Sequence, residues 1–212
     1  MRTRSLSLFL FGAICAFSQP VGFGIKGGIP LTNFVSAVHS GTFDFDSSTN
    51  RYIVGPTVEL RLPGGLGVEF DALYRRLHYN GSGFVNNAFA TSQTTGNNWE
   101  FPLLLKYRIP TEVVRPYVDA GIAWNTLTGI KQTVSNAATS VSSAFTSTSN
   151  PPELHRNVSE GFVVGVGVDI HVLLHLSPEV RYTRWGSSLL QDANGILQTK
   201  RDQAEFLIGI TF

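Results

Sequence analysis

Strict alternation of apolar and polar residues is the feature that most constrains this fold. It is clearest in residues 98–109, where every second residue from Trp99 to Ile109 is apolar and the intervening positions include Glu100 and Lys106. Side chains of a β-strand point to opposite faces in turn, so this period predicts a strand with one apolar and one polar face. The same period recurs in seven further segments: 21–31, 52–62, 66–76, 115–125, 161–172, 174–184 and 205–212. We therefore expect an all-β fold with eight strands, each of about 10 residues.

The connections between these segments alternate between short and long. The second and third segments are joined by Pro63-Gly64-Gly65, and two further connections are equally brief, at 110–114 and around Leu173. The remaining four are long and polar: 32–51, 77–97, 126–160 and 186–203. Serine and threonine make up ten of the eighteen residues of 133–150, a composition that indicates a mobile segment. Short turns at one end and long loops at the other are typical of outer-membrane β-barrels.

Alternation alone does not say which face points outward, and a soluble lipocalin-like barrel would expose its polar face. Charged residues make up only 15% of the chain, which is low for a soluble protein. The polar face is also interrupted by small residues: Gly24, Gly28, Gly67, Gly121, Gly165, Gly167 and Gly209. Glycine suits a narrow interior, where long side chains from the opposite wall need room. These features favour a membrane barrel with its apolar face toward lipid.

Aromatic residues lie near the strand ends, as in the interfacial girdles of membrane barrels. If the N-terminus lies in the periplasm, two tryptophans fall at the loop-bearing rim and three other aromatics at the opposite rim: Trp99 and Trp124, then Phe23, Tyr107 and Phe212. Trp185 is out of phase with Tyr182, so its position predicts a side chain inside the barrel.

The first eighteen residues have the pattern of a secretory signal. Arg2 and Arg4 precede an apolar run from Leu6 to Phe17, which is too short to span a bilayer as a helix. We expect cleavage after Ser18, leaving residues 19–212 as one barrel domain exported from the cytoplasm.

Three segments resemble the small bacterial outer-membrane barrels of the PorT-like and OmpA/OmpX-like type. The opening Gly24-Ile25-Lys26-Gly27-Gly28-Ile29-Pro30-Leu31 is similar to their first strand, and Arg115-Pro116-Tyr117-Val118-Asp119-Ala120-Gly121 is similar to a later one. The final residues 205–212 resemble their C-terminal signature. That resemblance implies an outer-membrane location among its lipids, and a barrel assembly machinery that recognises the last strand through Phe206, Ile208, Ile210 and Phe212.

The predicted inner face carries nearly balanced charge. It holds seven basic and eight acidic residues: Lys26, Arg61, Arg75, Lys106, Arg108, Arg115 and Arg181, with Glu59, Glu69, Asp71, Glu100, Asp119, Asp169, Glu179 and Glu205. An eight-stranded interior is just wide enough for its own side chains. Unpaired charges there would be costly. We therefore expect these residues to pair and plug the lumen, for example Arg61 with Glu69; an ion-conducting lumen is the alternative.

Enzyme and metal chemistry are weaker interpretations. His175, Ser177 and Glu179 share one strand face, as a lipid A deacylase-like triad would require. However, they start a strand at the end expected to face the periplasm, away from lipid A. His171 and His175 lack an evident third metal ligand. The formal net charge of +1 does not indicate nucleic-acid binding, and no cofactor site is predicted.

The sequence thus predicts a non-enzymatic outer-membrane barrel with a plugged, charged lumen. Its role would be envelope integrity, adhesion or capture of a surface ligand through the loops 126–160 and 32–51. A narrow pore and an outer-membrane lipid hydrolase are the alternatives.

Overall fold

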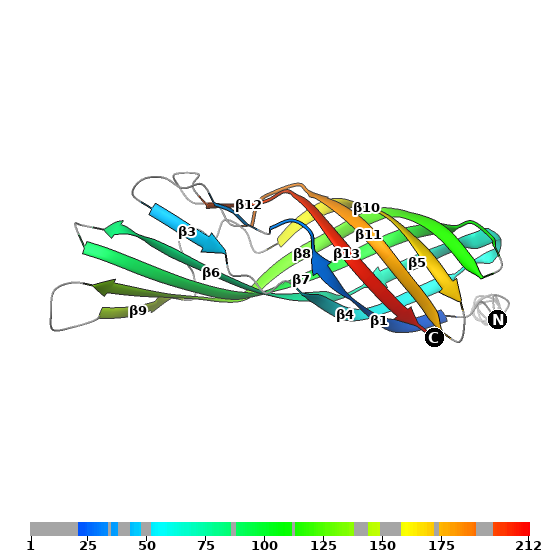
Figure 1. Ribbon diagram of the computed structural model, residues 1–212, viewed down its shortest axis with the longest axis horizontal. Helices are drawn as coiled ribbons and strands as arrows, with labels where there is room; N and C mark the ends of the chain where they lie inside the picture. Colours follow the sequence, from blue (N-terminus) through cyan, green and yellow to red (C-terminus); the bar gives the residue numbers. More distant parts are fainter. Residues whose placement is uncertain are drawn as a thin grey trace, which may run out of the picture.

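The computed structural model is a closed antiparallel β-barrel (Figure 1). It describes residues 21–33, 35–37, 43–47, 52–85, 88–111, 113–137, 144–148, 158–171, 174–189 and 197–212. The predicted signal segment, residues 1–18, lies outside these ranges. No helix among the described residues is long and apolar enough to span a bilayer.

The barrel wall consists of nine strand segments in the order in which they pair around the ring. They are β1 (Val21–Pro30), β4 (Ile53–Arg61), β5 (Leu66–Asp71) followed by β6 (Leu73–Val85), β7 (Ala88–Arg108), β8 (Val114–Ala137), β10 (Val158–His171), β11 (His175–Trp185) and β13 (Asp202–Thr211). The first and last strands pair and close the ring, with Gly24 opposite Thr211. The backbone N–H of Phe212 extends this closure by donating to the carbonyl oxygen of Phe23 at 2.9 Å.

β5 and β6 are two parts of one strand. They are separated only at Ala72, and the pairing register with β4 is the same on both sides of it: Thr57 lies opposite Asp71, and Val54 opposite Tyr74. Ala72 lies opposite Pro56, which has no backbone N–H to donate, although the Ala72 N–H still bonds to the Pro56 carbonyl oxygen at 3.0 Å. Counted this way the wall has eight strands, so the predicted fold class is confirmed.

The two ends of the barrel differ in their connections. One end, here called the turn end, carries the short turn η1 (Pro63–Gly65) and the last residue, Phe212 (Figure 1). In this turn Gly64 has a φ of 78°, a left-handed conformation that glycine adopts without steric cost. From the opposite end, here called the loop end, the sheet extends well beyond the ring.

The prediction that 77–97 and 126–160 form loops is wrong for much of their length. β6 and β7 pair continuously as far as Val85 and Ala88, and β8 continues to Ala137, where it pairs with β9 (Ala144–Thr148). The polar composition suggested loops, but threonine has high β-propensity and the paired backbone satisfies its own hydrogen bonds. Three shorter strands lie in the other predicted loops: β2 (Val35–Ala37), β3 (Phe43–Ser47) and β12 (Leu197–Thr199).

A β-bulge marks the start of the extension between β7 and β8. The register shifts between Thr95 and Asn97, opposite Gly129, whose φ is 61°. An extra residue on one strand exchanges the two faces beyond it. As a result Ile130 and Gln132 are buried, whereas Lys131 is exposed.

The outer surface of the ring is apolar on every strand. Its exposed residues include Leu105 at 57% and Phe162 at 75% of their full accessibility. Isolated in water, such a continuous apolar belt would be strongly unfavourable, and in lipid it is matched. The charged residues are therefore on the inside, as the alternation predicted.

Candidate functional site

The barrel lumen contains all fifteen of the charged residues that the sequence placed on the inner face. Thirteen of them are buried: Lys26, Glu59, Glu69, Asp71, Arg75, Glu100, Lys106, Arg108, Asp119, Asp169, Glu179, Arg181 and Glu205. Arg61 and Arg115, at the turn end, are half-buried. Alternation delivers them there because every second residue of each strand points inward.

The centre of the lumen is a cluster of three cations and three carboxylates. Its members are Lys26, Lys106 and Arg181 with Glu69, Asp71 and Glu179. We call this set the central cluster. Arg181 donates from Nε to Glu179 at 2.6 Å and from its two terminal nitrogens to Asp71 at 3.0 Å and Glu69 at 3.3 Å. Its formal charges sum to zero, so burial leaves no net charge in the lumen.

Lysines complete the central cluster from two other strands. Lys26 reaches Glu179 at 3.1 Å and Asp71 at 3.3 Å, and it also pairs with Glu69. Lys106 contacts the other oxygen of Glu69. Each carboxylate of the cluster thus has at least two cationic partners, which offsets the desolvation cost that an isolated buried charge would carry.

The pairs of the central cluster cross the lumen rather than following its wall. In the ring of eight strands, β5 and β11 are four positions apart and therefore lie on opposite sides. The ion pair between Asp71 of β5 and Arg181 of β11 spans this diameter. Lys26 of β1 joins β5 and β11 from a third side.

A second layer of polar contacts lies toward the turn end. Arg108 donates from Nε to Asp169 at 2.9 Å and from a terminal nitrogen to Glu59 at 2.6 Å. His175 Nδ1 lies 2.9 Å from the other oxygen of Asp169. Arg61 contacts His175 Nε2 and Thr211 at 3.0 Å each.

The lumen becomes more apolar toward the loop end. Arg75 donates to Gln203 at 3.2 Å and lies 3.6 Å from Glu205. Beyond it are two buried apolar groups: Leu104, Ala123, Val163 and Trp185, and Ile53, Leu73 and Leu207. Trp185 is only 2% exposed, so its side chain points inward as its position predicted.

Two neutral side chains of the network were missed when only charged residues were considered. Thr57 donates to Asp71 at 2.5 Å. Tyr117 donates to Glu179 at 3.2 Å, and the Nζ of Lys106 lies 4.2 Å from the centre of its ring. Both residues share the inward phase of their strands, and this signal was already present in the sequence.

Inward glycines make room for these side chains. A Cβ on Gly165 would lie 2.4 Å from Asp119 Oδ1, and one on Gly167 would lie 2.5 Å from the ring of Tyr117. Real Cβ atoms do not approach so closely. The same explanation does not extend to Gly24, where a Cβ would meet the backbone oxygen of Ile210 instead.

Three sequence-based interpretations need correction. Glu69 pairs with Lys26, Lys106 and Arg181, so the suggested pair with Arg61 is wrong. The register across the barrel, not position along a strand, decides which charges meet.

Arg115 has a different environment from the other inner cations. Its Nε donates to the carbonyl oxygen of Thr111 at 3.0 Å, and among the described residues no carboxylate lies within ion-pair distance of it. The reason is its place at the first turn of β8, where the side chain reaches the mouth of the lumen.

The suggested hydrolase triad does not assemble. The Ser177 hydroxyl donates to the Gly209 carbonyl oxygen at 3.4 Å, while His175 and Glu179 bind different partners in different layers. Within the described ranges, no three His, Cys, Asp or Glu side chains are grouped to hold a metal ion.

The five aromatics proposed as girdles lie on the outer face. Phe23, Tyr107 and Phe212 are exposed at the turn end, and Trp99 and Trp124 are half-buried farther along the wall. Trp99 packs against two neighbours that the sequence analysis did not single out, with ring centres 5.1 Å from Tyr74 and 6.2 Å from Phe101.

The chain was compared with known families and structures. Residues 17–186 match the family described as outer membrane protein beta-barrel domain. Its fold is similar to that of the outer membrane protein OprG from Pseudomonas aeruginosa, with a TM-score of 0.53 and 15% identity over 92% of this chain and 97% of that one. A more distant likeness is Ail, the attachment invasion locus protein of Yersinia pestis, with a TM-score of 0.41 and 11% identity over 91% and 96% of the two chains.

No curated protein matches the sequence. The family match covers most of the chain, and it agrees with the closed eight-stranded ring and its apolar outer surface. The chain therefore belongs to the outer membrane protein beta-barrel domain family and resides in the bacterial outer membrane.

Proposed function

We propose that this protein is a non-enzymatic scaffold whose lumen is closed by its own side chains and whose biological role lies in the hairpins beyond the loop end. The observation that carries the proposal is the central cluster. The Asp71–Arg181 pair spans the barrel at 3.0 Å, and Lys26 bridges both walls beside it. Water and ions would have to separate these buried pairs in order to pass.

The length of the strands supports the second half of the proposal. A membrane-crossing strand needs about 10 residues, but β7 has 21 and β8 has 24. The surplus forms paired hairpins that project from the ring (Figure 1). Such rigid, polar projections suit contact with a ligand at the cell surface, through the region 126–160 and the neighbouring region 32–51.

Planar-bilayer recording tests the closed lumen. We expect the purified wild-type barrel to show no steady conductance, and the double variant Glu69→Ala with Arg181→Ala to show small openings. Folding of each variant is checked by heat-modifiable migration on gels. Stable wild-type channels of uniform size, altered by substitution of Lys106, would instead support the narrow pore.

Cysteine labelling on intact cells tests the orientation of the hairpins. Thr146→Cys, in β9, should react with a membrane-impermeant maleimide. Pro63→Cys, in the turn η1, should react only after the outer membrane is permeabilised. Labelling of position 63 alone would show that the hairpins point into the periplasm, and a role at the surface would then be excluded.

A further inference from the structure

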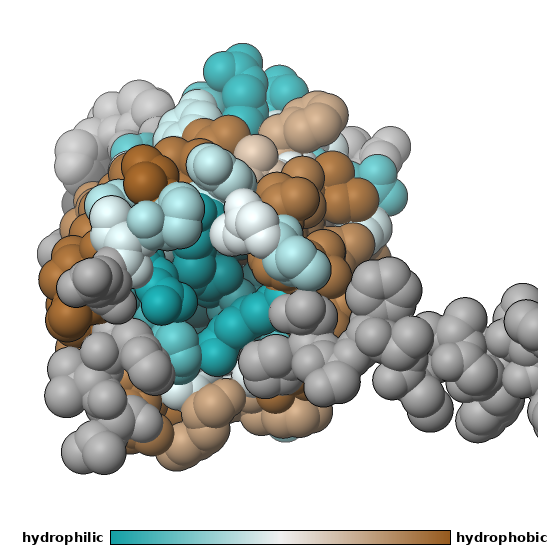
Figure 2. Space-filling model, turned by 90° about the vertical axis from the view of Figure 1, so that its right-hand side faces the viewer, coloured by the Kyte–Doolittle hydropathy of each residue, from teal (hydrophilic) through white to brown (hydrophobic). Residues whose placement is uncertain are grey.

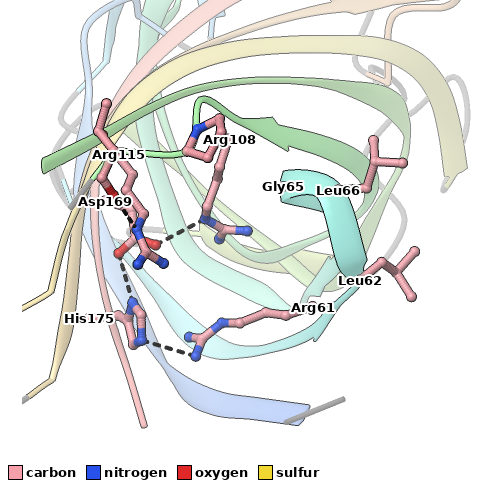
Figure 3. A pocket seen from close by; sticks show the side chains of 10 residues that line it. Arg61, Leu62, Gly65, Leu66, Arg108, Arg115, Asp169 and His175 are labelled. Carbon is pink, nitrogen blue, oxygen red and sulfur yellow. Dashed lines mark hydrogen bonds and ion pairs between the residues drawn. The ribbon is translucent and has the colours of Figure 1, made fainter. Parts of the chain in front are cut away.

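The turn end of the barrel opens into a polar cup with a volume of about 250 Å³. Figure 2 looks onto this end, where hydrophilic residues line a hollow surrounded by hydrophobic ones. The charged and titratable residues of the cup come from four strands, β4, β7, β8 and β10, and from the start of β11: Arg61, Arg108, Arg115, Asp169 and His175. Figure 3 shows how their side chains converge.

The cup contains more positive than negative charge. Three guanidinium groups line it, those of Arg61, Arg108 and Arg115, but only one carboxylate does, that of Asp169. Glu59, just below, binds Arg108 at 2.5 Å and lies 3.7 Å from Arg61 Nε. Counting both carboxylates still leaves one excess positive charge.

Hydrogen bonds assign the single negative charge of the lining to the floor of the cup. One oxygen of Asp169 accepts from Arg108 Nε and the other lies 2.9 Å from His175 Nδ1. Since arginine only donates, His175 Nε2 must accept from Arg61, and Nδ1 therefore carries the proton given to Asp169. His175 is accordingly neutral, and both oxygens of Asp169 are occupied.

The remaining donors belong to Arg115 and Arg61. Arg115 uses Nε on the Thr111 carbonyl oxygen, and within the part of the chain that the structure describes its two terminal nitrogens have no acceptor. Arg61 is held by neutral partners, His175 and Thr211, at 3.0 Å each. Neither arginine has a carboxylate of its own at hydrogen-bonding distance.

We propose that this cup binds a phosphate group through Arg115 and Arg61, with Arg108 fixed beneath it. Guanidinium forks match the oxygens of phosphate and bind them in pairs. The volume is that of about eight water molecules, which accommodates a phosphate together with part of the molecule that carries it. Two sources share this chemistry: a small phosphorylated solute, and a phospholipid headgroup, because Leu62 and Leu66 line the same cup.

Calorimetric titration of the folded barrel in a zwitterionic detergent tests the proposal with inorganic phosphate as the probe. We expect saturable binding with a millimolar dissociation constant. Arg115→Gln should weaken binding about tenfold or more, because it removes a charge-assisted donor pair. Arg184→Gln is the matched control, since Arg184 is an exposed arginine of β11 near the loop end, and it should leave binding unchanged.

A second titration with short-chain phosphatidic acid in the same detergent distinguishes the two sources. Binding at least tenfold tighter than that of inorganic phosphate, and equally sensitive to Arg115→Gln, assigns the cup to a lipid headgroup. Similar affinities assign it to a soluble phosphate. If neither probe binds saturably to the folded barrel, or if Arg184→Gln weakens binding as much as Arg115→Gln does, the proposal is refuted.

Discussion

Replacement of Arg181 by methionine should strongly destabilise the barrel. The side chain is 0% exposed and makes three ion pairs, with Glu69, Asp71 and Glu179. Methionine keeps much of its volume but leaves three carboxylates facing two lysines. Removing one partner of a buried ion pair costs about 3–5 kcal/mol, so we expect Arg181→Met to lower the free energy of unfolding by that amount.

A double-mutant cycle isolates the pair that crosses the lumen. Asp71→Asn retains the contact with Thr57 but loses the charge facing Arg181. Combined with Arg181→Met, it should cost less than the sum of the two single changes, with a coupling of about 1–3 kcal/mol for residues in direct contact. The assay is reversible urea unfolding of the barrel in lipid vesicles, followed by tryptophan fluorescence.

Arg184→Met is the matched control on the same strand. Arg184 faces outward, is 65% exposed at its side chain, and lies 3.4 Å from Asp202; such a surface pair contributes less than about 1 kcal/mol. If Arg181→Met costs no more than Arg184→Met, or if the cycle is additive within about 0.5 kcal/mol, then the central cluster does not hold the lumen together.

Two further predictions concern glycine packing and barrel closure. Gly167→Ala should cost about 1–3 kcal/mol in the same unfolding assay, because the new Cβ would lie 2.5 Å from Tyr117; at Gly27 the nearest atom is 3.6 Å away, so Gly27→Ala should cost clearly less. Deleting Phe212 should reduce the amount of heat-modifiable protein in the outer membrane, because its N–H bonds to Phe23 where the first and last strands meet. Normal levels of the truncated protein would contradict the second prediction, and equal costs for the two glycine variants the first.

The register of β-strands explains which parts of the charge network were predictable. The alternating period placed Glu69 and Arg181 on the inner face, because side-chain direction in a strand depends only on local geometry. Their contact depends on the tilt and stagger of strands that are 112 residues apart in sequence. No local pattern contains that information, and this is why the suggested partner of Glu69 was wrong.

The long polar segments show the opposite limit. Their serine and threonine content indicated loops, yet Thr94 pairs with Gln132 in a continuous ladder between β7 and β8. A polar strand satisfies its backbone only when a neighbour of matching register lies beside it, and the closed ring supplies that neighbour by holding the two strands side by side.

The sequence by itself determined the eight-stranded barrel, its apolar outer face and the inward charges, since each follows from a period of two and from the spacing of turns. Only the tertiary structure decided the partners inside. It brought Asp71 and Arg181 together across the lumen, and it left Arg115 at the turn-end mouth without a carboxylate within the described chain. The physical reason is that direction along a strand is local, whereas contact across a barrel depends on how all eight strands are staggered when the ring closes.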